Sequence, residues 1–179
     1  MNSPLTVPEN VSFAEAIAVT EQLMEAIATG NIDQSEIETR VRDLVASRDG
    51  ARGFFVAYLT DSRPQSDRPS PEICRALSSS EEIVGELLAK NISMSAAMVL
   101  THQRQNHPEM AADSAKVRDR SARLIRCLNS SVLRENCRQM LESARTGEGI
   151  YRSFLEKWGY DDEQRQAIVT ALEEAIAAP

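Results

Sequence analysis

Apolar residues along this chain recur at intervals of three and four positions, which is the spacing of amphipathic helices. The longest such stretch covers residues 79–105, where Ile83, Leu87 and Met98 fall on one side of a helix. It contains no proline, and Ser79 is followed three residues later by Glu82, which is the spacing of a capping box. We therefore expect a long central helix that begins at Ser79.

The same periodicity predicts further helices on both sides of this stretch, with Ser or Asp at their starts and Gly at several ends. The run 51–60, ARGFFVAYLT, also has strand propensity, but a strand needs a partner and the chain has no second comparable run. We therefore predict a buried helix or helical turn there. The other predicted helices cover approximately residues 12–29, 33–49, 71–77, 108–128, 130–146, 148–159 and 162–176.

These elements predict an all-α fold, a single compact domain of about eight helices around a long central antiparallel hairpin formed by residues 79–105 and 108–128. Residues 1–11 contain two prolines and few apolar side chains, so we expect an extended N-terminal arm, with residues 12–179 as one all-α domain. Residues 61–70 have two prolines and three serines, which is typical of a mobile surface loop.

Three polar residues, Asn91, Ser95 and His102, lie along the apolar face of the central helix. If the hairpin turns near residue 107, Ser121 lies opposite the region of Asn91 and Ser95, and Ser114 lies near His102. The favoured interpretation is a ladder of hydrogen bonds that fixes the register of the two helices, because buried polar groups must be paired. The alternative is a polar pocket between the helices that holds a small ligand.

His102 and the three cysteines are the residues that could carry chemistry. A histidine acts as a base or metal ligand when partners are suitably spaced, but the sequence has no HExxH or Cys-His motif. Cys74, Cys127 and Cys137 show no CxxC spacing, and we expect them to be buried small apolar side chains. We therefore predict no catalytic residue, no metal ligand and no cofactor.

Charge is unevenly distributed along the chain, whose net charge is −7. Residues 1–50 carry 9 acidic and 3 basic side chains, whereas residues 100–145 carry 5 acidic and 9 basic ones. Lys116, Arg120 and Arg123 share one flank of the predicted helix 108–128, which is either a solvated flank or a docking surface for an acidic protein partner. Nucleic acid is not an expected partner, because Asp113 and Asp119 interrupt the basic flank and it lacks aromatic residues.

The first ten residues, MNSPLTVPEN, lack the basic region and apolar run of a secretory signal. No uninterrupted apolar run reaches the roughly 20 residues of a membrane span. We therefore expect a cytoplasmic protein without membrane contact.

Three segments carry a resemblance to a known group of proteins: ARGFFVAYLT (51–60), NISMSAAMVLTHQRQ (91–105) and YRSFLEKWGYDDEQR (151–165). Together they resemble uncharacterised small helical proteins of cyanobacteria. The resemblance implies a cytoplasmic helical protein of a photosynthetic cell, and no activity or site residue comes with it.

Two functional classes remain after these steps. The first is a non-enzymatic protein-interaction, assembly or regulatory module. Its partner is another protein or a second copy of the same chain. The second is a small-molecule-binding protein or enzyme that uses the polar pocket around Asn91, Ser95 and His102.

Overall fold

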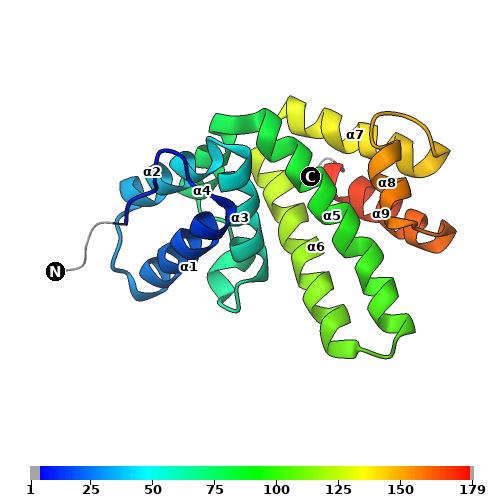
Figure 1. Ribbon diagram of the computed structural model, residues 1–179, viewed down its shortest axis with the longest axis horizontal. Helices are drawn as coiled ribbons and strands as arrows, with labels where there is room; N and C mark the ends of the chain where they lie inside the picture. The colour runs from blue at the N-terminus through cyan, green and yellow to red at the C-terminus, as the bar shows by residue number, and fades with distance from the viewer. Residues whose placement is uncertain (1–4, 178–179) are drawn as a thin grey trace. The chain divides into compact units, whose positions relative to one another are not determined.

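The computed structural model describes residues 5–177, and they are all-α, as predicted (Figure 1). Within this range the helices are α1 (Phe13–Thr29), α2 (Gln34–Val45), α3 (Arg48–Thr60), η1 (Pro64–Asp67), α4 (Pro71–Leu77), η2 (Ser78–Ser80), α5 (Glu81–Arg104), α6 (Pro108–Leu128), α7 (Ser131–Thr146), α8 (Arg152–Trp158) and α9 (Asp162–Ile176), where η denotes a 3-10 helix.

The chain divides into two compact units, one extending to Val84 and the other beginning at Gly85. The first unit contains α1 to α4, and the second contains nearly all of α5 and α6 to α9. The single domain 12–179 stays a prediction. Of the predicted arm, residues 1–4 lie outside the described residues, and residues 5–11 precede α1 without forming a helix.

Most of the predicted helix boundaries are correct because the capping residues act as expected. Ser12 forms a capping box with Glu15, and Asp161 forms another with Gln164. α1 ends at Gly30, which takes a left-handed conformation (φ 68°) that favours glycine. These local hydrogen bonds define the start and end of an element before any tertiary contact is considered.

Several predicted boundaries are wrong; α8, for example, begins at Arg152 rather than near residue 148. α2 ends at Val45 rather than near residue 49, because the Ser47 side chain accepts a hydrogen bond from the Gly50 backbone and starts α3. Ser79 forms no capping box: it lies in η2, and its hydroxyl donates to the Ala76 carbonyl at 2.6 Å. The long helix α5 therefore begins at Glu81.

The run with strand propensity forms α3 and supplies much of the core of the first unit. The Phe54 ring stacks on Tyr58 with centroids 5.3 Å apart and meets Phe55 edge-on at 5.4 Å. All three rings are at most 1% exposed. The run forms a helix despite its strand propensity, because a helix buries these large rings in the core.

α1 and α3 lie side by side in the first unit and approach closely through small residues (Figure 1). A Cβ added to Gly53 would lie 2.5 Å from the Ala16 Cβ and 2.7 Å from the Phe13 carbonyl oxygen. The buried Thr20 hydroxyl donates to the Ala16 carbonyl at 2.7 Å, so it needs no partner on α3. The distance between the two helices is thus set by the missing side chain at Gly53.

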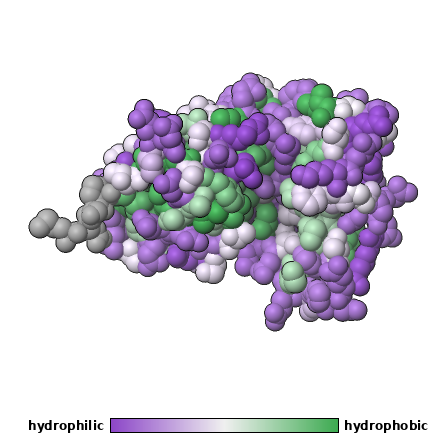
Figure 2. Space-filling view, in the orientation of Figure 1, coloured by the Kyte–Doolittle hydropathy of each residue, from purple (hydrophilic) through white to green (hydrophobic). Residues whose placement is uncertain are grey.

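Part of the predicted 61–70 loop is ordered into the short helix η1, where Ser66 is 1% exposed. Its mobility stays a prediction. On the visible face of the first unit, apolar residues gather in a band over α1 and α3 (Figure 2). Val56 of α3 is 45% exposed and is one of the large apolar residues that remain at the surface of this unit.

In the second unit, α5 and α6 form the predicted antiparallel hairpin (Figure 1). Its turn is closed by a hydrogen bond from the His107 backbone N–H to the His102 carbonyl at 2.9 Å, with Asn106 in a left-handed conformation (φ 57°). α7 approaches α5 at Gly85, where an added Cβ would lie 3.3 Å from the Leu133 Cα. The α5–α6 hairpin therefore also packs closely against α7.

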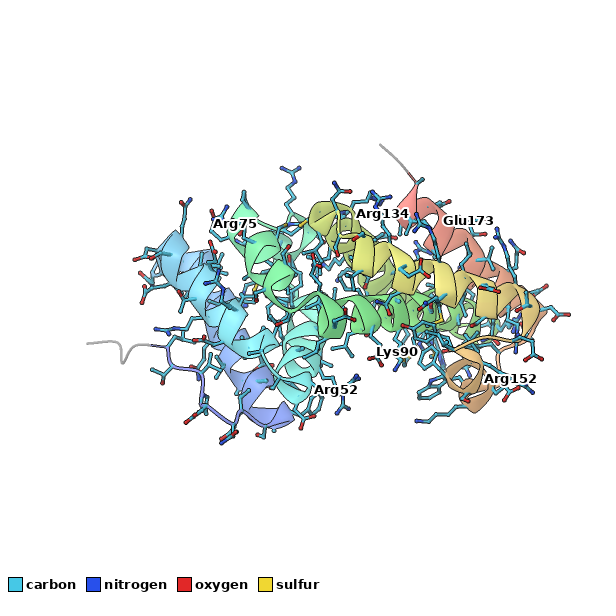
Figure 3. The ribbon with its side chains drawn as sticks, turned by 90° about the horizontal axis from the view of Figure 1, so that it is seen from above. Arg52, Arg75, Lys90, Arg134, Arg152 and Glu173 are labelled. Atoms are coloured by element: carbon cyan, nitrogen blue, oxygen red, sulfur yellow. The ribbon has the colours of Figure 1, made fainter. Side chains whose placement is uncertain are left out.

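α7 and α9 run antiparallel, and polar contacts attach α8 and α9 to their neighbours. Arg134 at the start of α7 donates to the Ile176 carbonyl at the end of α9 at 3.1 Å. Lys90 points from α5 toward α8, where its ammonium lies 5.5 Å from the centroid of the Phe154 ring (Figure 3). The Gln164 side chain donates to the Thr101 hydroxyl at 2.9 Å, which joins α9 to α5.

The helical stretch Pro71–Arg104 is long and apolar enough to cross a membrane by length and composition alone. Its most apolar window has a mean hydropathy of 1.4, and 56% of that window is buried. A buried core helix of a soluble protein passes the same test. The expectation of no membrane contact therefore stays a prediction.

Replacing Gly53 with alanine should destabilise the first unit, because the new methyl group would overlap Ala16 and the backbone of α1. Overpacking of this kind costs about 1–3 kcal/mol of unfolding free energy, which exceeds the gain of about 1 kcal/mol in helix propensity. Urea unfolding followed by circular dichroism would measure it, with Thr39→Ala on the exposed side of α2 as the control. A Gly53→Ala protein as stable as wild type would contradict the close α1–α3 approach.

Asp161 should make stability depend on pH in the acid range. The Arg104 guanidinium, 2.6 Å from the Asp161 carboxylate, together with the Gln164 backbone N–H, lowers the pKa of Asp161 below its usual value. A depressed native-state pKa contributes stability above the unfolded-state pKa, and this contribution is lost as pH falls through the native-state pKa.

Asp161→Asn, which can still cap α9, should therefore lower the melting temperature at pH 7 by a few degrees. The difference from wild type should narrow as the pH drops below about 4. Asp43→Asn is the control, because Asp43 has no ion pair among the described residues. A difference that does not change with pH would mean that the Asp161 charge contributes nothing.

Candidate functional site

Two serines of the predicted polar line, Ser95 and Ser121, form their side-chain hydrogen bonds within their own helices. The Ser95 hydroxyl, 6% exposed, donates to the carbonyls of Asn91 at 2.7 Å and Ile92 at 3.1 Å. The fully buried Ser121 hydroxyl donates to the Val117 carbonyl at 2.8 Å. Such bonds to the preceding turn satisfy a buried hydroxyl without a partner on a second helix.

These contacts support neither interpretation of the polar line. A register ladder requires bonds between α5 and α6, whereas Ser95 and Ser121 donate to α5 and α6 themselves. A ligand pocket requires an open space, and the three cavities described below have other linings. The five residues Asn91, Ser95, His102, Ser114 and Ser121 therefore stay a prediction as a site.

His102 is 8% exposed, and its Nδ1 atom is buried without a hydrogen-bond partner among the described residues. A catalytic histidine normally has its second ring nitrogen oriented by a carboxylate or carbonyl, and His102 lacks this orienting contact. Within residues 5–177, no group of three or more His, Cys, Asp or Glu side chains is placed to hold a metal ion.

Cys137 is fully buried, as predicted, and burial raises the pKa of its thiol to about 12. Because the thiolate is the nucleophilic form, a thiol with this pKa is inert near neutrality. Cys74 and Cys127 are partly exposed rather than buried, so the prediction of three buried cysteines is wrong for these two.

The predicted docking flank on α6 is only partly at the surface. Lys116 and Arg123 are exposed, and Lys116 lies 3.7 Å from Asp113 in an ion pair. Arg120 is 1% exposed and is among the largest fully buried side chains. Arg120 therefore cannot belong to an exposed docking surface. The sequence places Arg120 on a flank of the helix but does not show that another part of the protein covers this flank.

Three of the five basic residues of α6 line a small groove between α5, α6 and α9. Its volume is about 150 Å³, and we call it the arginine groove. Ala122 and Ala171 are small side chains that leave space between α6 and α9, and buried Ile92 adds an apolar contribution from α5. The charged residues that line it are Arg118, Asp119, Arg123, Arg126 and Glu174.

The arginine groove has an excess of positive charge. Arg118 donates to the Asp119 carboxylate at 2.9 Å. Arg126 lies in the last turn of α6, is exposed, and makes no ion pair within the described part of the chain. A cation at a helix C-terminus is favourably placed for the helix dipole, so Arg126 is stable there without a carboxylate partner. The groove can therefore accept an added negative charge.

Of the three residues that the sequence assigned to a docking surface, Arg120 is the one that the structure buries. The contribution of α9, through Ala171 and Glu174, could not be read from the run itself. Helical spacing does place residues 119, 122, 123 and 126 on one side of α6, and this was the available signal.

The first unit has a larger and more acidic groove of about 690 Å³ between α1, the start of α2 and the segment around Arg63. Its three carboxylates belong to Glu21, Glu25 and Glu36. Its one cation, Arg63, is paired with Glu25 at 3.1 Å and with Asp61 at 3.1 Å. The two units thus carry grooves of opposite charge character.

The chain is similar to one family of known proteins. A model of the family described as uncharacterised conserved protein UCP020893 matches residues 12–175. The chain belongs to this family. The resemblance to uncharacterised proteins that the sequence suggested is therefore confirmed. No curated protein matches the chain. No solved structure matches it either.

Cys137 should be unreactive in the folded protein, because it is buried and its thiol pKa is raised. We expect iodoacetamide at pH 8 to leave the peptide that contains Cys137 unmodified in the native protein and to alkylate it fully in urea. Mass spectrometry of the digested protein measures this. Rapid alkylation under native conditions would show that α7 exposes this thiol.

Proposed function

We propose that this protein is a non-enzymatic interaction module that binds an acidic segment of a partner protein in the arginine groove. The observation that carries the proposal is the combination of size and charge at this place. About 150 Å³ is below the roughly 300–1,000 Å³ of typical small-molecule sites, and it suits one or two side chains of a docked segment.

The chemistry of the groove indicates the kind of segment. Arginine side chains bind carboxylates through paired N–H donors, and they are enriched at the centres of protein interfaces. The apolar contributions of Ala122, Ala171 and Ile92 favour an apolar side chain next to the acidic ones. An acidic segment with leucine or a similar residue therefore matches the groove better than a purely acidic one.

Nucleic acid is a weaker match to the same surface. Asp119 and Glu174 lie within the groove, where they would repel a phosphate backbone, and the whole chain has a net charge of −7. A protein segment can place its acidic groups around these two carboxylates, whereas the even charge spacing of a nucleic acid cannot. The two carboxylates therefore favour a contact with a few specific residues of a peptide over an extended contact with a charged backbone.

The proposal is tested by fluorescence anisotropy with a labelled peptide of alternating glutamate and leucine residues. Wild type should bind it saturably, and the affinity should fall with added salt. Arg126→Glu should weaken binding at low salt by about tenfold, because it replaces the unpaired cation of the groove with a like charge. Sedimentation velocity on the same samples would show whether a second copy of the chain competes for the groove.

Arg138→Glu is the matched control, since it makes the same change of charge on the exposed side of α7, where Arg138 lies 3.7 Å from Glu135. The control should bind the peptide as wild type does. Equal weakening by both variants would mean that only net charge matters, and the assignment to the groove would then be wrong.

A further inference from the structure

A second cavity in the second unit has the size and chemistry of a small-molecule site. It lies between the end of α7 and the first half of α9, and its volume is about 490 Å³. This volume falls within the range of typical ligand pockets, unlike the arginine groove. It is lined by Ala144, Arg145, Thr146, Gly147, Tyr160, Asp162, Arg165, Gln166 and Val169.

Arg165 is the central feature of this cavity. Its Nε donates to the Tyr160 carbonyl at 3.4 Å, which orients the guanidinium. No carboxylate pairs with it among residues 5–177, although Asp162 stands one helical turn earlier on α9 and lines the same cavity. An oriented, half-buried arginine without an acidic partner retains the paired N–H donors that bind carboxylate and phosphate groups.

The backbone at the end of α7 leaves room for this guanidinium. Gly147 takes a left-handed conformation (φ 72°), and a Cβ there would lie 3.6 Å from the Arg165 Nη1 atom. Any larger side chain would extend toward the guanidinium and the space around it. Gly147 therefore both ends α7 and keeps the approach to Arg165 open.

The other polar residues of the cavity are compatible with an anionic ligand. Arg145 also lines the cavity, and its charge is already balanced by an ion pair with Glu173. The Thr146 hydroxyl donates to the Glu142 carbonyl at 2.9 Å and accepts from the Glu148 N–H at 3.1 Å, so it does not compete for Arg165. Burial raises the pKa of Tyr160 to about 12, which keeps its hydroxyl neutral and able to donate.

We propose that this cavity binds a small polar molecule that carries a carboxylate or phosphate group, with Arg165 as its main contact. The site is independent of the arginine groove: its residues come from the end of α7 and the first half of α9, and none of them lines that groove. The acidic groove of the first unit does not offer the same chemistry, because its one arginine is paired with two carboxylates.

Isothermal titration calorimetry of the full chain with inorganic phosphate and, separately, with succinate tests the proposal and distinguishes the two anions. We expect one of them to bind saturably at millimolar or lower concentration with a stoichiometry of one. Arg165→Gln should weaken that binding at least tenfold, and Arg165→Lys should give an intermediate loss because it keeps the charge without the paired donors. Arg138→Gln on α7 is the control and should bind as wild type does.

Amide shifts of the wild-type protein in heteronuclear NMR provide a measurement that needs no variant. Addition of the bound anion should shift the resonances of Gly147, Tyr160 and Arg165, and should leave Arg126 in the arginine groove unchanged. The proposal would be overturned if neither anion bound saturably up to about 20 mM, because a weaker dissociation constant means almost no binding free energy. Equal weakening by Arg165→Gln and Arg138→Gln, or shifts centred on Arg126, would overturn it as well.

Discussion

Close approach of helices through small residues is the constraint on which each unit depends. Gly53 permits α1 and α3 to meet in the first unit, and Gly85 permits α5 and α7 to meet in the second. Interiors are packed as densely as organic crystals, so an added methyl at such a crossing forces the neighbouring atoms to move. Small side chains elsewhere leave grooves between helices.

Both sites proposed for the second unit follow from this principle. Ala122 and Ala171 leave the shallow space of the arginine groove between α6 and α9. At the opposite part of α9, the termination of α7 at Gly147 leaves the larger cavity around Arg165. One helix thus lines both the groove and the cavity that we propose as binding sites. In both places the proposed binding rests on an arginine that has no carboxylate partner among the described residues.

Local signals in the sequence predicted the fold class and most elements, whereas contacts between distant segments were not predictable. Ser12, Asp33 and Asp161 start helices through hydrogen bonds within three residues, so the sequence alone suffices to locate them. Ser79 failed as a start signal because its hydroxyl bonds back to Ala76. The burial of Arg120 and the lack of a carboxylate partner for Arg165 could not be predicted from the sequence. Both depend on elements that lie far away along the chain.

The internal bonding of the buried hydroxyls has a consequence for how the sequence of this family can vary. Thr20, Ser93 and Ser121 each donate to the carbonyl four residues earlier in their own helix. That carbonyl already accepts a backbone N–H of the helix itself, so loss of the hydroxyl leaves no acceptor unpaired. Alanine can replace such a serine during sequence drift without a compensating change on a facing helix. The interior polarity of these helices can therefore change over generations without a matching change on the packed faces of neighbouring helices.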